Sequence, residues 1–175
     1  SQPRPVVRML CESGYDERGL ASLISARDPY VAYHHAAPAE AGLAAQAVGY
    51  WQRAGQRAHA RAAPAEAVVH FTQGLTLLPT LPDGPERVQQ ELTLQLALGP
   101  ALMVTRGFAA PEVGAAYTRA RLLCQQVEET PELFRVLRGL FGFYEVQAQL
   151  QTAHELAEQL LHLAQRLQEP ALLVE

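Results

Sequence analysis

The sequence contains no lysine, and this absence limits the partners that the protein can have. Its 14 basic side chains are all arginines, they are scattered among 18 acidic residues, and the net charge is −4. A protein that binds duplex nucleic acid displaces counterions with a dense basic surface, and the sequence encodes no such surface. The composition therefore argues against nucleic-acid binding.

Long hydrophobic runs are also missing. No apolar stretch approaches the ~20 residues that a membrane-spanning helix needs, and the opening SQPRPVVRML lacks the sustained apolar region of a signal peptide. The two cysteines, Cys11 and Cys124, lie far apart and form no CxxC pair, so we expect reduced thiols rather than a disulfide. These features predict a cytoplasmic protein that does not enter the membrane.

The signatures of several enzyme classes are absent. No GxxxxGK[ST] loop is present to hold nucleotide phosphates, and no GxSxG turn is present to carry a serine nucleophile. The acidic residues lie at expected helix starts or on polar stripes, which is not the context of a catalytic carboxylate pair. We therefore expect a protein without a cofactor and without catalytic activity.

Helix-forming residues are abundant, chiefly Ala, Leu, Gln, Glu and Arg. Prolines recur along the chain, and several stand beside a glutamate, as in PAEAVVHF, PERVQQEL, PEVGAAYT and PELFRVL. The first turn of a helix tolerates proline, and the helix dipole stabilises a carboxylate there. The pattern predicts helices over residues 39–62, 64–79, 85–106, 111–128, 131–149 and 151–168, with another beginning at Pro170.

The predicted fold class is all-α, with antiparallel helix pairs joined by short turns and no strand. Pro100 falls inside a predicted helix and is expected to kink or break it. The beginning of the chain is less regular, with one possible helix over residues 16–27 between loops. We therefore separate a poorly defined N-terminal segment, residues 1–38, from a helical region, residues 39–175.

The clearest internal order lies between Trp51 and Pro79, where small and aromatic residues have the spacing of a tetratricopeptide repeat. Two helices cross closely only where small side chains meet, and Ala54, Gly55 and Ala67 supply these. The flanking aromatic rings would fill the space beside the crossing. The residues of this signature are Trp51, Ala54, Gly55, Ala58, Ala67, Phe71, Gly74 and Pro79.

Two further copies of the signature are weaker. The second copy has Leu98, Gly99 and Leu102 on its first helix and Val113, Tyr117 and Ala120 on its second. The third copy has Gly139 or Gly142 on its first helix and Ala153, Ala157 and Leu160 on its second. Residues 170–175 would begin a fourth copy. The sequence thus predicts about three stacked helix pairs in a right-handed superhelix.

Several long segments carry a resemblance to a known family. They are AGLAAQAVGYWQRAGQRA, AEAVVHFTQGLTLLPTLPD, PERVQQELTLQLALGPALM, GFAAPEVGAAYTRARLLCQQV and ELAEQLLHLAQ. They resemble the tetratricopeptide-like C-terminal region of bacterial multidomain signalling ATPases, over roughly residues 33–175. In that family, nucleotide-cyclase-like and ATPase domains often precede the helical repeats. The resemblance implies a repeat region that senses or scaffolds, and residues 1–32 do not share it.

A candidate partner-binding groove follows from the repeat geometry. A helical-repeat array presents the first helix of each pair on its concave side, where a partner binds. Polar residues on the first helices of the first and third copies would therefore meet a protein or peptide, although an ordinary solvated surface is the alternative at each position. The residues of this candidate groove are Gln52, Gln56, His59, Arg135, Arg138 and Glu145.

The alternative function is a small hydrolase or a metal-binding protein that uses the N-terminal segment. Cys11 or Ser13 would supply the nucleophile, and His34 or His35 would supply the base. Adjacent residues of a helix point in different directions, so the two histidines do not easily aim at one atom. A packing role at the start of the helical region is the competing interpretation of this pair.

The predicted helix 151–168 carries two patterns. His154, Glu158 and His162 share one face but span ~12 Å, which is too far for a single metal ion. The other face is apolar and would be exposed at the end of an uncapped array, so we expect a homodimer through this surface. The residues of this apolar stripe are Leu156, Leu160, Leu163 and Leu167.

Overall fold

The computed structural model describes residues 38–126 and 131–167. Within these ranges the chain forms α-helices, one short 3₁₀ helix and no strand. The elements are α3 (Pro38–Ala60), α4 (Pro64–Leu77), η2 (Leu78–Thr80), α5 (Pro85–Arg106), α6 (Pro111–Cys124), α7 (Pro131–Val146) and α8 (Leu150–Leu167). The all-α prediction is confirmed for this part of the chain.

Proline marks the start of every described α-helix except α8, and the sequence predicted this for α4 to α7. Glutamates follow in the first turns of α4 to α7, where they complement the helix dipole. The ends of the helices were predicted less well. α4, α6 and α7 all stop short of the predicted ends, and α5 continues through Pro100 without a break. Buried neighbours on both sides of Pro100, Gly99 and Ala101, hold that part of α5 in the core.

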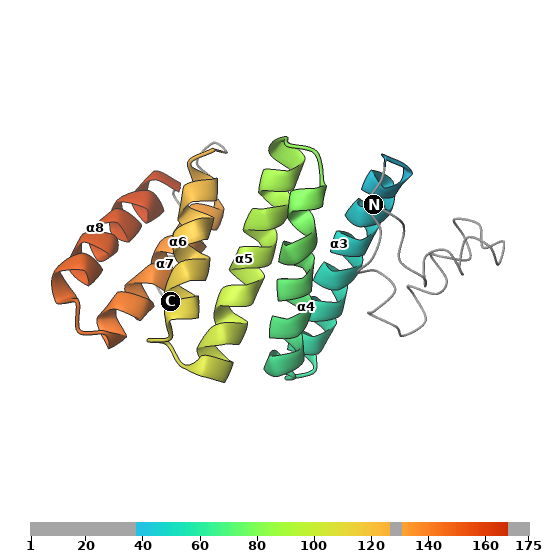
Figure 1. Ribbon diagram of the computed structural model, residues 1–175. Coiled ribbons are helices and arrows are strands. Elements are labelled where there is room, and N and C mark those ends of the chain that lie inside the picture. Colours follow the sequence, from blue (N-terminus) through green and yellow to red (C-terminus); the bar gives the residue numbers. More distant parts are fainter. Residues whose placement is uncertain (1–37, 127–130, 168–175) are drawn as a thin grey trace.

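The helices lie side by side in the order of the sequence, from α3 to α8 (Figure 1). α3 packs against α4, α5 against α6 and α7 against α8, and each pair also packs against the next through α4–α5 and α6–α7. Smaller contacts join α3 to α5 and α5 to α7. Each helix therefore contacts its near neighbours in sequence, which is the contact pattern of stacked helical units.

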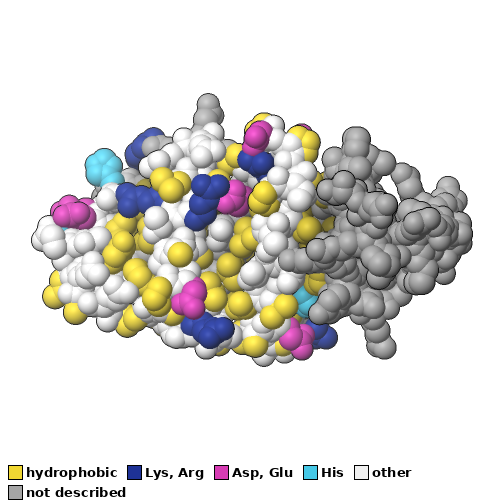
Figure 2. Space-filling model, viewed as in Figure 1, with side chains coloured by type: hydrophobic (Ala, Val, Ile, Leu, Met, Phe, Trp, Pro, Cys, Tyr) yellow, Lys and Arg dark blue, Asp and Glu magenta, His cyan; other side chains and the backbone are white. Residues whose placement is uncertain are grey.

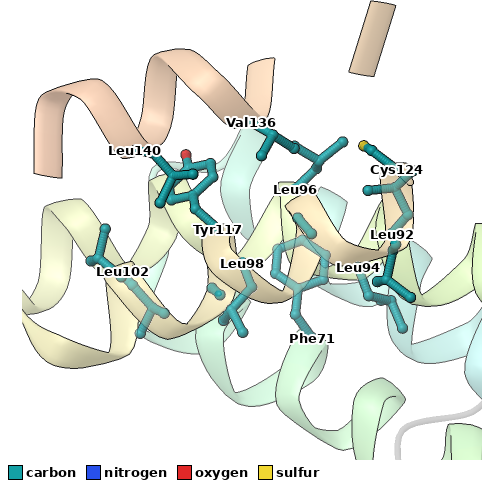
Figure 3. Close-up of a cluster of buried hydrophobic side chains, with 14 of the residues drawn as sticks. Phe71, Leu92, Leu94, Leu96, Leu98, Leu102, Tyr117, Cys124, Val136 and Leu140 are labelled. Carbon is teal, nitrogen blue, oxygen red and sulfur yellow. The ribbon is translucent and has the colours of Figure 1, made fainter. Parts of the chain in front are cut away.

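The core runs continuously through these contacts (Figure 3). α5 lies between α4 and α6 and is buried on both sides, so Leu92, Leu94, Leu96 and Leu98 are all buried although they follow every second position. A paired ion bridge reinforces the α5–α6 contact, because the guanidinium of Arg119 donates to both carboxylate oxygens of Glu91 at 2.5 and 2.9 Å.

Two turns between paired helices share one backbone geometry. After α3, the amide of Ala63 donates to the carbonyl of Ala58 at 2.9 Å, and Ala62 has a φ of 54°. After α7, the amide of Gln149 donates to the carbonyl of Tyr144 at 2.9 Å, and Ala148 has a φ of 56°. This is a Schellman cap, in which the left-handed residue is usually glycine. Alanine at this position gave no sequence signal, which explains why the ends of α3 and α7 were predicted too late.

The left-handed alanine gives a testable prediction. Ala62→Gly should raise the free energy of unfolding by about 0.5–1 kcal/mol, because glycine adopts a positive φ without the steric cost that a Cβ brings. Ala115→Gly, at an exposed position inside α6, is the matched control and should lower it by about 1 kcal/mol. Urea unfolding measures both, and a loss of stability in both variants would contradict the turn geometry.

The apolar stripe of α8 is buried rather than exposed. Leu156 and Leu163 are 2% and 6% exposed, and Leu160 is half-buried. The prediction that Leu156 and Leu163 are exposed is therefore wrong, and the homodimer itself stays a prediction. α8 is amphipathic and packs against α7, so its apolar face turns onto its own partner. The side chain of Leu167 lies outside the described residues.

Candidate functional site

The first two copies of the repeat signature place a glycine against an aromatic ring of the same helix pair. A Cβ atom on Gly55 would lie 2.4 Å from the ring of Phe71, and a Cβ atom on Gly99 would lie 2.5 Å from the ring of Tyr117. Only glycine allows such an approach, so each ring packs directly onto the backbone of the facing helix. The crossing of α3 with α4 thus recurs between α5 and α6.

The other residues of the signature differ in how deeply they are buried. Trp51, Ala58, Ala67, Gly74 and Ala120 are buried, Ala54 is half-buried, and Pro79 is exposed within the 3₁₀ helix η2. A Cβ on Gly74 would lie 3.1 Å from Leu94, so Gly74 lets α4 approach α5.

The third copy is arranged differently. Gly139, not Gly142, is the close-contact glycine of α7, since a Cβ on Gly139 would lie 2.2 Å from the ring of Tyr117, and nothing lies closer than 3.8 Å to a Cβ on Gly142. Tyr117 belongs to the preceding pair, so its ring is held between Gly99 of α5 and Gly139 of α7. No aromatic residue of α8 takes this position, and the corresponding residue of the signature is the half-buried Ala157.

In the first helix pair, the side chain of Trp51 on α3 contacts the imidazole of His70 on α4. Its ring stacks on His70 with centroids 5.5 Å apart and planes 28° apart. The indole Nε1 of Trp51 and the Nδ1 of His70 are both buried without a hydrogen-bond partner. Burial lowers the pKa of His70, while Glu66 raises it and Arg61 lowers it. The stacked pair therefore favours the neutral imidazole.

This lowered pKa predicts a pH dependence of stability. The folded state favours neutral His70. Its contribution to the free energy of unfolding is therefore fully present above the pKa of histidine in the unfolded chain, near 6.5, and is lost as the pH falls below that value. Urea unfolding at pH 7.5 and pH 5.5 should show a larger acid loss for the wild-type chain than for His70→Gln. Equal losses in the two proteins would contradict the assignment, and His59→Gln, at an exposed position, is the control.

The candidate groove residues lie on two helices that do not touch closely. On α3, Gln52 is half-buried and Gln56 and His59 are exposed. On α7, Arg135, Arg138 and Glu145 are exposed. α5 lies between α3 and α7 and contacts both (Figure 1). The six side chains therefore form two separate groups and do not converge on one point.

The two arginines of α7 are linked electrostatically to a buried ring. Burial raises the pKa of Tyr117, and the positive charges of Arg138 and Arg135 lower it. The ring of Tyr117 lies between Gly99 of α5 and Gly139 of α7, and the charges of the two arginines act on its hydroxyl. Sequence reasoning placed the arginines in the groove and Tyr117 in the core, and it did not connect them.

The middle of the same side is supplied by α5, which sequence reasoning omitted. Its exposed residues include Gln89 and Val104, with Thr93 and Pro100 half-buried between them. These positions recur every four or seven residues, so they share one side of the helix. Since α4 and α6 cover other sides of α5, this side stays open. We call this side of α3, α5 and α7 the odd-helix face.

The described residues show no metal centre. No group of three or more His, Cys, Asp or Glu side chains within them lies close enough to hold an ion. His154 and Glu158 lie 3.5 Å apart as an exposed pair on α8. Cys124 is a free, buried thiol whose pKa is raised by burial and by Glu132, so it is a poor nucleophile.

The residues of the alternative function, Cys11, Ser13, His34 and His35, lie outside the described residues. In the part of the chain that the structure covers, no helix is long and apolar enough to cross a bilayer. Comparison with protein-family models, curated proteins and solved structures finds no match to this chain. The function is therefore inferred from the residues and their geometry.

Proposed function

We propose that this chain is a non-catalytic helical-repeat module of the tetratricopeptide type that binds a protein or peptide. The observation that carries the proposal is the recurring crossing, in which Gly55 meets Phe71 and Gly99 meets Tyr117. Pairs with a similar internal crossing are the units that a helical-repeat superhelix stacks one after another. A right-handed superhelix would make the odd-helix face its concave, partner-binding side.

The side chains of the odd-helix face suit a polar partner with some apolar contact. Gln56 and Gln89 offer amide donors and acceptors, and Arg135 offers a planar guanidinium that suits carboxylates. Val104 is 71% exposed and adds apolar surface. An extended or helical peptide would contact several helices at once.

The wider context of the proposal comes from the sequence resemblance alone. The resemblance to repeat regions of bacterial signalling ATPases supports a cytoplasmic module that works beside nucleotide-cyclase-like and ATPase domains in a longer protein. Within such a protein, this region would receive the partner and the other domains would supply catalysis. No cofactor is part of the proposal.

The direct test is selection of peptides on the purified chain. A random peptide library displayed on phage should yield binders, and each binder is then titrated by fluorescence anisotropy against alanine variants of the odd-helix face. A few residues dominate most interfaces, so we expect at least one of Gln56→Ala, Gln89→Ala or Arg135→Ala to weaken binding about tenfold or more.

The control is Arg61→Ala. This side chain is exposed in the α3–α4 turn, where it donates to the carbonyl of Arg57 at 3.3 Å and forms an ion pair with Glu66 at 3.4 Å. This variant should bind the selected peptides as well as wild type does. Binders that are equally unaffected by all three face variants, or a selection without any binder, would contradict the assignment of this face.

A further inference from the structure

Four large apolar side chains are exposed at one end of the molecule. Val104 is 71% exposed at the end of α5, Phe108 is 50% exposed in the α5–α6 turn, Val146 is 57% exposed at the end of α7, and Leu150 is 68% exposed at the start of α8. We call these four residues the turn patch. The other large exposed apolar residues, Val69, Leu122 and Leu161, are spread singly over α4, α6 and α8.

The two turns that carry the patch lie against each other. The side-chain amide of Gln147 donates to the carbonyl of Ala109 at 3.3 Å, which joins the α7–α8 turn to the α5–α6 turn. The ring of Phe108 reaches α7, since it lies 3.8 Å from the position of a Cβ on Gly142. Both turns lie at the lower edge of Figure 1, and Figure 2 shows hydrophobic side chains along its lower left, where α7 turns into α8.

Two exposed charges of opposite sign lie at the ends of the helices that lead into the patch. Arg106 is the last residue of α5, and Glu145 is next to the end of α7. Phe108 lies between them, because its chain continues from α5 and its ring rests against α7. Neither Arg106 nor Glu145 forms an ion pair within the described residues.

We propose that the turn patch is a self-association surface that binds a second copy of this chain. A two-fold axis through Phe108 places the α5 side of one copy against the α7 side of the other, so that Arg106 of each copy faces Glu145 of the other. The apolar side chains then cover one another, and the charges meet in pairs. Clustered apolar surface with a self-complementary rim is what a symmetric contact requires, and a dissimilar partner would not need it.

The patch is small, so the dimer is weak. Four side chains provide less than the roughly 800 Å² per partner of a standard interface, and interfaces below about 1,200 Å² in total belong to transient contacts. The two charge pairs lie at the rim, so added salt weakens them. This surface is formed by helix ends and turns. It shares Val104 and Glu145 with the odd-helix face, whereas Phe108 belongs to the turn patch alone, so Phe108→Asp tests the dimer separately from peptide binding.

Sedimentation velocity on the full chain, from about 10 to about 500 µM, tests the proposal. The wild-type chain should shift from monomer toward dimer with concentration. Phe108→Asp should raise the dimer dissociation constant at least tenfold, and Val104→Asp serves as a second patch variant. Leu122→Asp is the matched control, because Leu122 is 48% exposed on α6, away from the patch, and it should dimerise as wild type does.

The charge pairs have their own test. Arg106→Glu and Glu145→Arg should each weaken the dimer, and the double variant, in which the two charges are exchanged, should regain most of the wild-type affinity at low salt. A wild-type chain that remains monomeric throughout the concentration range would overturn the proposal. So would a dimer that Phe108→Asp and Leu122→Asp weaken equally, or a double variant weaker than both single variants.

Discussion

Replacing Tyr117 by alanine is expected to lower the free energy of unfolding by about 3–5 kcal/mol. The ring of Tyr117 is 4% exposed and packs against Gly99 on α5 and Gly139 on α7. Its removal opens a cavity between two helix pairs, and glycine cannot extend a side chain to fill it. The loss therefore affects both the α5–α6 pair and its contact with α7.

Two variants separate the ring from the rest of the side chain. Tyr117→Phe keeps the ring and should cost no more than about 1.5 kcal/mol, the usual contribution of one hydrogen bond. Tyr144→Ala, on α7, removes a half-buried ring that meets Phe143 edge-on with centroids 5.1 Å apart, and should cost clearly less than Tyr117→Ala. Urea unfolding measures all three. A cost for Tyr117→Ala no larger than that for Tyr144→Ala would contradict the central position of Tyr117.

The second large effect is expected from two glycines only three positions apart on α7. Gly139→Ala should lower the free energy of unfolding by about 1–3 kcal/mol, because its methyl group would lie 2.2 Å from the ring of Tyr117 and would force that ring away. Gly142→Ala should raise the free energy by up to about 1 kcal/mol, because alanine favours the helix and its methyl group meets only Phe108, at 3.8 Å.

The stabilities of the two variants can be compared directly, because the same substitution is made twice in the same helix. The two variants should differ by about 1–4 kcal/mol in urea unfolding. Equal free energies would show that α7 does not cross the preceding pair at Gly139. A Gly142→Ala variant that loses more stability than Gly139→Ala would place the crossing at the other glycine.

The helix starts and the first two crossings could be predicted from the sequence because their signals are local. Proline with a nearby glutamate sets a helix start within one turn. The spacing between Gly55 and Phe71 brings the two residues together when one short turn joins the helices, and the same applies to Gly99 and Tyr117. These predictions needed only helix periodicity and a turn length.

The remaining features depend on contacts between pairs, which the sequence pattern does not record. Gly139 meets a ring of the preceding pair, and the spacing within its own pair could not reveal this. The sequence predicted that Leu156 would be exposed, but α8 turns its apolar face onto α7 and buries this side chain. Phe108 lies in a turn, where periodicity carries no information, and its place against α7 follows only from the joined turns.

The central claim is that the first two helix pairs repeat one crossing, and two double-mutant cycles test it most directly. One cycle combines Gly55→Ala with Phe71→Leu, and the other combines Gly99→Ala with Tyr117→Leu. In each cycle the smaller side chain should accept the added methyl group, so that the double variant is more stable than the sum of the single effects by about 1–3 kcal/mol. Coupling of the same sign and similar size in both cycles is the predicted result. Coupling in one cycle and simple additivity in the other would show that the two pairs do not share a crossing, and would contradict the repeat.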